Sequence, residues 1–192
     1  MTRRTMLGTL LFVACSGTQV KNPPSGPEPA VQLSAQAVLS TPKGLQAIPE
    51  GAVLHSGDLV AFHVQTSREL MFFVVQESTA HKLAMQIPNG KLSAVLVKAK
   101  QETRVPPQGT WLHPESEPGE QALYLVASRV PVEESVVLRL IEKREATRER
   151  EPPPVIIDKQ RGGDAATELV PPQVKTLGPD GFAIIPFRYY SE

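Results

Sequence analysis

The sequence predicts a mainly β protein, an antiparallel β-sandwich-like domain with one main α-helix. The first observation is residues 54–88, where apolar and polar side chains alternate with the period of a strand. The second is that helical spacing of apolar residues appears in one place, residues 132–150. The third is the count of 19 prolines in 192 residues, about twice ordinary usage, which favours short strands joined by many loops.

The N-terminus resembles the export signal of bacterial lipoproteins. Arg3 and Arg4 precede an apolar core, residues 6–13, of about eight residues, whereas a membrane span needs about twenty. The core ends in Phe-Val-Ala-Cys at residues 12–15, which resembles a lipobox, although leucine is usual where Phe12 stands. The resemblance implies cleavage after residue 14 and acylation of Cys15.

Cys15 is the chain's one cysteine, so a disulfide within one chain is excluded. The alternative to lipid attachment is a signal-peptide remnant with an incidental cysteine. Two or three acyl chains would hold the protein stably at a membrane. Because Ser16 stands where inner-membrane lipoproteins carry an acidic residue, the resemblance favours the outer membrane. Residues 15–30 are rich in Pro, Gly and Ser and are typical of a flexible tether before one domain, residues 31–192.

The domain is expected to begin with a strand at residues 31–40, followed by a Pro/Gly-punctuated connection at 41–51. Strands at 60–65, 70–75 and 82–87 then form a three-stranded antiparallel meander. The middle strand is apolar on both faces, which predicts a central position in its sheet.

Asn89-Gly90 predicts a type I′ hairpin turn, because both residues accept positive φ, with residues 92–97 as the returning strand. Short extended segments follow at 102–105 and 121–128. The second of these is expected to be buried, since its apolar side chains fall on both faces.

The apolar residues from 132 to 141 recur at helical spacing and predict a helix whose stripe packs on the sheet. Residues 142–151 are almost all charged and are expected to project into solvent. An irregular insertion follows at 151–177, and the Gly-Pro-Asp-Gly turn at 178–181 leads into a last strand, 182–190. Pro186 inside that strand indicates a sheet edge or a bulge.

Residues 54–132 contain a series of short turn motifs, namely Gly57-Asp58 before a strand, Pro88-Asn89, Pro118-Gly119-Glu120 and the Ala-Ser-Arg-Val-Pro of residues 127–131. In these motifs the segment resembles a bacterial family known as domain of unknown function 4384. The chain departs from the family at Glu69-Leu70-Met71, where glycine and tyrosine are common. The resemblance implies a β-rich envelope module with no established activity and hence no catalytic residues.

The sequence offers no pattern for catalysis or metal binding. Four histidines, at 55, 63, 81 and 113, lack His-x-His or His-x-x-x-His spacing, and no nucleophile stands beside a base. His55 with Asp58 could hold a metal, but turn chemistry accounts better for both. The prediction is a protein that is not an enzyme and takes no cofactor or metal.

Two segments are candidates for contact with a partner. Trp111 and His113 lie in a proline-rich loop, and exposed aromatic residues concentrate binding energy, although Trp111 could instead close one end of the core. Arg188, Tyr189 and Tyr190 lie in the last strand, where an edge could accept a partner's strand.

Charge argues against nucleic acid as a partner. Removal of residues 1–14 deletes Arg3 and Arg4 and leaves 18 basic against 20 acidic residues, whereas phosphate binding needs a concentrated basic surface. The sequence therefore predicts a lipid-anchored interaction or accessory subunit of a cell-envelope assembly (secretion, motility or surface complex). The alternative is a glycan- or small-ligand-binding module that uses the Trp111 loop.

Overall fold

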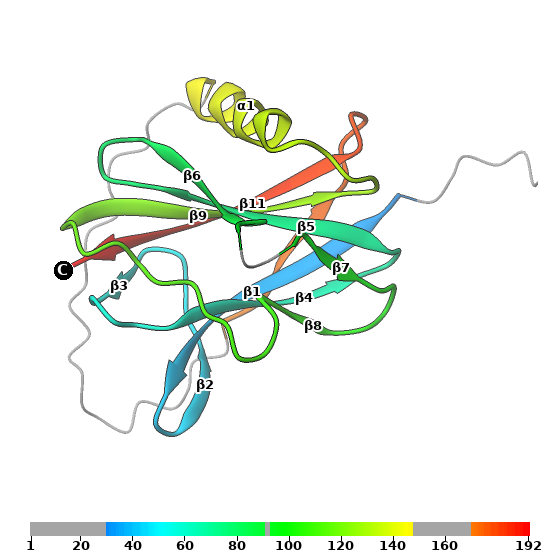
Figure 1. Ribbon diagram of the computed structural model, residues 1–192. Helices are drawn as coiled ribbons and strands as arrows, with labels where there is room; N and C mark the ends of the chain where they lie inside the picture. The colour runs from blue at the N-terminus through cyan, green and yellow to red at the C-terminus, as the bar shows by residue number, and fades with distance from the viewer. Residues whose placement is uncertain (1–29, 91–92, 148–169) are drawn as a thin grey trace, which may run out of the picture.

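A computed structural model describes residues 30–90, 93–147 and 170–192. In this part of the chain, two β-sheets stack face to face and one helix covers the outer face of the second sheet (Figure 1). This arrangement confirms the predicted mainly β, sandwich-like class with a single main helix. The predicted signal peptide, Cys15, residues 16–29, residues 91–92 and residues 148–169 lie outside the described residues.

Sheet A has five strands in the order β10-β1-β4-β8, with β2 pairing on β1 beside β10. Its strands are β1 (Gln32–Thr41), β2 (Gly44–Ala47), β4 (Val60–Thr66), β8 (Thr103–Val105) and β10 (Gln173–Thr176). Sheet B has six strands in the order β3-β11-β9-β5-β6, with β7 also pairing on β5. Its strands are β3 (Ala52–Leu54), β5 (Leu70–Glu77), β6 (Leu83–Ile87), β7 (Val95–Val97), β9 (Gly119–Ser128) and β11 (Phe182–Ser191).

The core between the sheets follows from the period-two pattern. Alternate residues of each long strand point inward and are buried, among them Val60, Phe62 and Val64 of β4. The opposite face of sheet B is buried too, because α1 (Glu134–Ala146) packs on it through Val137 and Ile141. Strands β5 and β9 are apolar on both faces for this reason.

The predicted three-stranded meander is wrong at its first connection. Strand β4 pairs with β1 and β8 in sheet A, whereas β5 pairs with β9, β6 and β7 in sheet B. The turn at residues 67–69 therefore carries the chain from one layer to the other. Alternation along β4 is equally compatible with either sheet, so local pattern could not choose between them.

The predicted Asn-Gly hairpin is also wrong. Strands β6 and β7 do not pair with each other in this fold; both pair with β5, at Val74–Glu77 and Leu70–Phe72 respectively, and so lie end to end along its edge. Gly90 does not adopt positive φ, and the Asn89 side chain instead donates to the Gln86 carbonyl. Three further strands were not predicted: β2 lies in the expected connection at 41–51, β10 lies in the expected irregular insertion at 151–177, and β3 lies between that connection and the first strand of the expected meander.

The turns that position the last strand agree with the sequence. Gly178 donates its N–H to the Phe182 carbonyl at 2.7 Å, and Gly181 has a φ of 82° that closes the turn without strain. At the start of β4, an Asp58 carboxylate oxygen accepts the His55 N–H at 2.8 Å, which confirms turn chemistry for this pair. Among the described residues, no helix has the length and apolar character needed to span a membrane.

Candidate functional site

The last strand, β11, has one edge that no full-length strand covers. Strand β9 pairs with β11 along residues 182–191, while on the other side β3 pairs only with Tyr189, Tyr190 and Ser191. The uncovered carbonyls are satisfied individually by other groups. Gly178 N donates to Phe182 O at 2.7 Å, and Arg144 Nη1 donates to Ile184 O at 2.9 Å. Gln173 Nε2 donates to Pro186 O at 3.3 Å, and Gly51 N donates to Arg188 O at 2.7 Å.

This edge is therefore closed to strand addition. Pro186 has no N–H and sits on the edge, as the sequence predicted. The residues predicted to pair with a partner's strand already have backbone partners on this side. Strand β3 runs beside Tyr189 and Tyr190, and the Gly51 N–H binds the Arg188 carbonyl. Proteins often protect the exposed edge of a sheet with side chains that prevent a strand of another chain from pairing there.

Arg188 is enclosed by carboxylates on the helix side of sheet B. Its guanidinium lies 3.0 Å from Glu145 of α1, 3.4 Å from Glu50 and 3.9 Å from Glu120, and its side chain is only 13% exposed. Burial alone would lower the pKa of Arg188, but the surrounding carboxylates, Glu145 first, raise it above its ordinary value. Arg188 thus joins α1 to sheet B. The sequence predicted that the charged end of the helix projects into solvent. Glu145 departs from this prediction, because it contacts Arg188 of sheet B.

Tyr189 points the other way, into the core, and is fully buried. Its hydroxyl donates to Gln121 Oε1 at 2.8 Å and accepts from Gln76 Nε2 at 3.2 Å. Burial raises the pKa of Tyr189 to about 12. Tyr190 is half-buried, and its hydroxyl oxygen is buried without a partner among the described residues. Neither tyrosine is an exposed aromatic contact.

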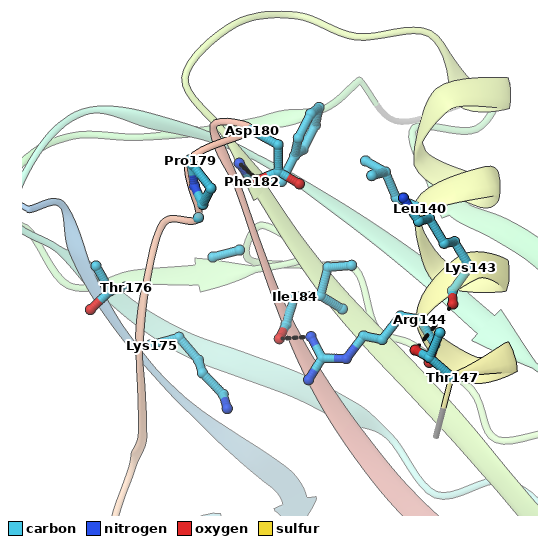
Figure 2. A pocket seen from close by; sticks show the side chains of 12 residues that line it. Leu140, Lys143, Arg144, Thr147, Lys175, Thr176, Pro179, Asp180, Phe182 and Ile184 are labelled. Atoms are coloured by element: carbon cyan, nitrogen blue, oxygen red, sulfur yellow. Dashed lines mark hydrogen bonds between the residues drawn. The ribbon is translucent and has the colours of Figure 1, made fainter. Parts of the chain in front are cut away.

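A hollow with a volume of about 420 Å³ lies between the C-terminal half of α1 and the turn that joins β10 to β11 (Figure 2). We call it the helix–hairpin groove, after α1 and the tight turn between β10 and β11, although these two strands pair in different sheets. One side is formed by Leu140, Lys143 and Arg144 of α1, and the other by Lys175 of β10 and the turn carrying Asp180. Phe182 and Ile184 of β11 lie between the two sides.

Three cations line the helix–hairpin groove. Arg144 reaches across to β11 and donates to the Ile184 carbonyl, so its charge is held in place without a carboxylate from the described residues (Figure 2). Lys143 and Lys175 are exposed and make no ion pair with any residue that the structure describes. Asp180, the one acidic residue among the described lining residues, accepts the Phe182 N–H within the turn. The groove is therefore cationic.

No pattern in the sequence predicted this groove. Lys175 belongs to β10, whose residues Gln173–Thr176 carry one apolar side chain and gave no strand pattern. Arg144 is one of many charged residues at the helix end, and its bond to a β11 carbonyl depends on how the helix docks. The helix itself was predicted, and the basic residues of its last turn were the only feature of the sequence that could have indicated a cationic groove.

The Trp111 loop is held by Arg104 of β8. The guanidinium carbon of Arg104 lies 3.8 Å from the centroid of the Trp111 ring, a cation–π contact. Arg104 also donates to the carbonyls of Pro107 and Thr110, at 2.9 and 2.6 Å, which closes the loop. Trp111 is half-buried and His113 is exposed. One face of the indole is therefore occupied by the protein's own side chain.

We expect Trp111→Ala to lower the free energy of unfolding by about 1–2 kcal/mol, because the stacked cation and the half-buried ring are both lost. Trp111→Phe should lose less than half of that, since a ring remains for Arg104. Urea denaturation followed by far-UV circular dichroism measures both. Equal stability of the alanine variant and the unaltered protein would show that the loop is not held by this stack and would restore Trp111 as a free contact residue.

The remaining candidate residues lie apart from one another in the fold. His63 pairs with Glu102 at 2.6 Å and His81 with Glu77 at 2.9 Å, on different sheets. Glu77 also accepts the Tyr124 hydroxyl, and burial raises the pKa of Tyr124. Within residues 30–90, 93–147 and 170–192, no three His, Cys, Asp or Glu side chains are grouped so as to hold a metal ion.

Comparison of the chain with models of known protein families, with curated proteins and with solved structures finds no match.

Proposed function

We propose that this protein is a non-enzymatic interaction subunit of a cell-envelope assembly, held at the outer membrane by a lipid on Cys15. The sequence supports the anchor through the lipobox-like residues 12–15 and the tether that follows them. The observation that carries the proposal is the helix–hairpin groove, where Lys143 and Lys175 have no carboxylate partner among the described residues. Exposed cations around a hollow are suited to a charged partner.

The rest of the described surface gives less support to other kinds of contact. The edge of β11 is satisfied by Arg144, Gln173 and Gly51, so strand addition there would first have to break these bonds. The glycan-binding alternative needs a free aromatic face, and Arg104 stacks on one face of Trp111. The groove is therefore the surface on which we place the partner.

The test is crosslinking in living cells of the acylated, tagged protein, followed by purification and quantitative mass spectrometry. We expect one or two envelope proteins in amounts close to that of the protein itself. The double substitution Lys143→Glu and Lys175→Glu should reduce their recovery by about tenfold or more, because reversed charges repel an acidic partner. Lys43→Glu with Lys98→Glu makes the same change in net charge at exposed residues outside the groove and should leave recovery unchanged.

Two results would contradict the proposal. Recovery of no protein in stoichiometric amount, with retained polysaccharide or cell-wall material, would favour the glycan-binding alternative. If the protein is found unacylated in the soluble fraction, the proposed lipid anchor is wrong. A Cys15→Ser variant is the control for the second result, because it cannot be acylated at the lipobox-like cysteine.

A further inference from the structure

The cations of the helix–hairpin groove are not fully explained by the fold. Basic residues in the last turn of a helix offset the partial negative charge at its C-terminus, and Lys143 and Arg144 are in that turn. Lys175 comes from another element, on the opposite side of the groove, and no helix end accounts for it. Figure 2 shows Lys175 and Arg144 pointing into the space between the hairpin and the helix from opposite sides.

The groove also presents apolar surface next to these charges. Leu140, Phe182 and Ile184 line it and are only partly buried, although all three are large apolar residues. Its volume of about 420 Å³ lies in the range of about 300–1,000 Å³ in which ligand sites are found. A ligand that matches both features carries negative charge and an apolar group close together.

We propose that the helix–hairpin groove binds an acidic peptide segment of a partner protein, which rests on the function proposed above and specifies its ligand. Carboxylates of the peptide meet Lys143, Arg144 and Lys175, while a neighbouring apolar side chain covers Leu140 and Phe182. Arg144 is a preorganised donor, because its bond to the Ile184 carbonyl fixes the side chain before the ligand arrives. A peptide in which acidic and apolar residues alternate carries both kinds of group close together.

The shape of the groove favours a peptide over a membrane surface. The cations line a hollow and lie on two separate elements, whereas anionic headgroups form a broad surface that suits cations on a flat or convex face. Asp180 lies at the turn of the hairpin and would repel a continuous anionic surface laid across the groove. A short acidic segment can place its carboxylates beside the lysines without extending over Asp180.

The experiment measures fluorescence anisotropy of a labelled peptide, Glu-Leu-Glu-Leu-Glu, titrated with the full acylated protein in neutral detergent micelles. We expect saturable binding that weakens by about tenfold or more when Gln replaces Glu in the peptide. Lys143→Glu with Lys175→Glu should weaken binding by a similar factor, and Lys43→Glu with Lys98→Glu should not change it. Raising the salt concentration from about 0.05 M to about 0.5 M should weaken it further, because exposed charges are screened.

Three results would overturn the inference. The first is equal affinity for the Gln and Glu peptides, or no binding of either. The second is that the same double substitution abolishes binding to vesicles containing phosphatidylglycerol while the peptide does not bind, which would assign the groove to lipid. The third is a self-association, seen by sedimentation, that the substitution removes, which would make a second copy the occupant.

This experiment can fail separately from the proposed function. If the peptide does not bind but cellular crosslinks to an envelope protein persist, the protein is an interaction subunit whose partner chemistry is different. If the peptide binds and no envelope protein is recovered in cells, the groove has the inferred specificity and the proposed assembly is wrong.

Discussion

Replacing Arg188 by methionine should lower the free energy of unfolding by about 3 kcal/mol, because it leaves carboxylates without their cation in a largely buried setting. Arg188 is 13% exposed and lies 3.0 Å from Glu145, which is itself 23% exposed. Loss of one member of a buried pair is estimated at about 3–5 kcal/mol, and the lower end applies here since Glu50 and Glu120 remain about half in water. Methionine keeps most of the side-chain length, so lost packing contributes little.

The measurement is urea denaturation followed by the fluorescence of Trp111, the only tryptophan in the chain. Arg139→Met, on the exposed side of α1, is the matched control and should change stability by about 0.5 kcal/mol or less. The double variant Arg188→Met with Glu145→Leu should regain part of the loss, because the carboxylate that lies nearest to Arg188 is removed as well. If Arg188→Met were no more harmful than Arg139→Met, the charge cluster would not be what holds the helix end to the sheet.

Phe187→Ala should be at least as harmful, with an expected loss of about 3–5 kcal/mol. Phe187 is 2% exposed in the core between the sheets. Its ring meets Phe62 edge-on, with centroids 6.2 Å apart, and stacks on Tyr189 at 6.1 Å. A hollow of about 230 Å³ already adjoins Phe187, so removal of the ring would enlarge an existing space.

Phe187→Leu separates the size of the side chain from its ring and should lose about 1.5 kcal/mol or less. Leu96→Ala is the control for the loss of a large apolar side chain at the surface, since Leu96 is 51% exposed and should matter by about 0.5 kcal/mol or less. Urea denaturation midpoints for the three variants decide the outcome. A loss for Phe187→Ala no greater than for Leu96→Ala would mean that the two sheets do not depend on this contact.

We expect different residues to determine the stability of the fold and the binding of the partner. Arg188 and Phe187 hold the fold, and both lie in β11, whose outer edge is closed by Arg144, Gln173 and Gly51. Lys143 and Lys175 make no described ion pair and are exposed, so their reversal is expected to affect partner binding with little change in stability. Arg144 belongs to both groups, because it satisfies a β11 carbonyl and lines the groove.

The sequence by itself determined the class of fold and most of the long elements. Alternation along residues 31–40, 60–65, 121–128 and 182–190 was enough to predict strands, because one or both faces of each are buried and the pattern records that burial. The single helix was predicted for the same reason, since Val137 and Ile141 pack on sheet B. Local turn chemistry at Gly57-Asp58 and at residues 178–181 was also predicted correctly.

Only the tertiary structure decided which strands are neighbours and where the cations gather. Strand β4 pairs in a different sheet from β5, and β6 and β7 share one edge of β5, because pairing is chosen by the packing of whole layers rather than by a strand's own alternation. Strand β10 has almost no apolar pattern and exists because β1 offers it an edge. The helix–hairpin groove joins Arg144 to Lys175 across 31 positions of sequence. Such a juxtaposition depends on the docking of α1 against β11, which no local spacing of charges encodes.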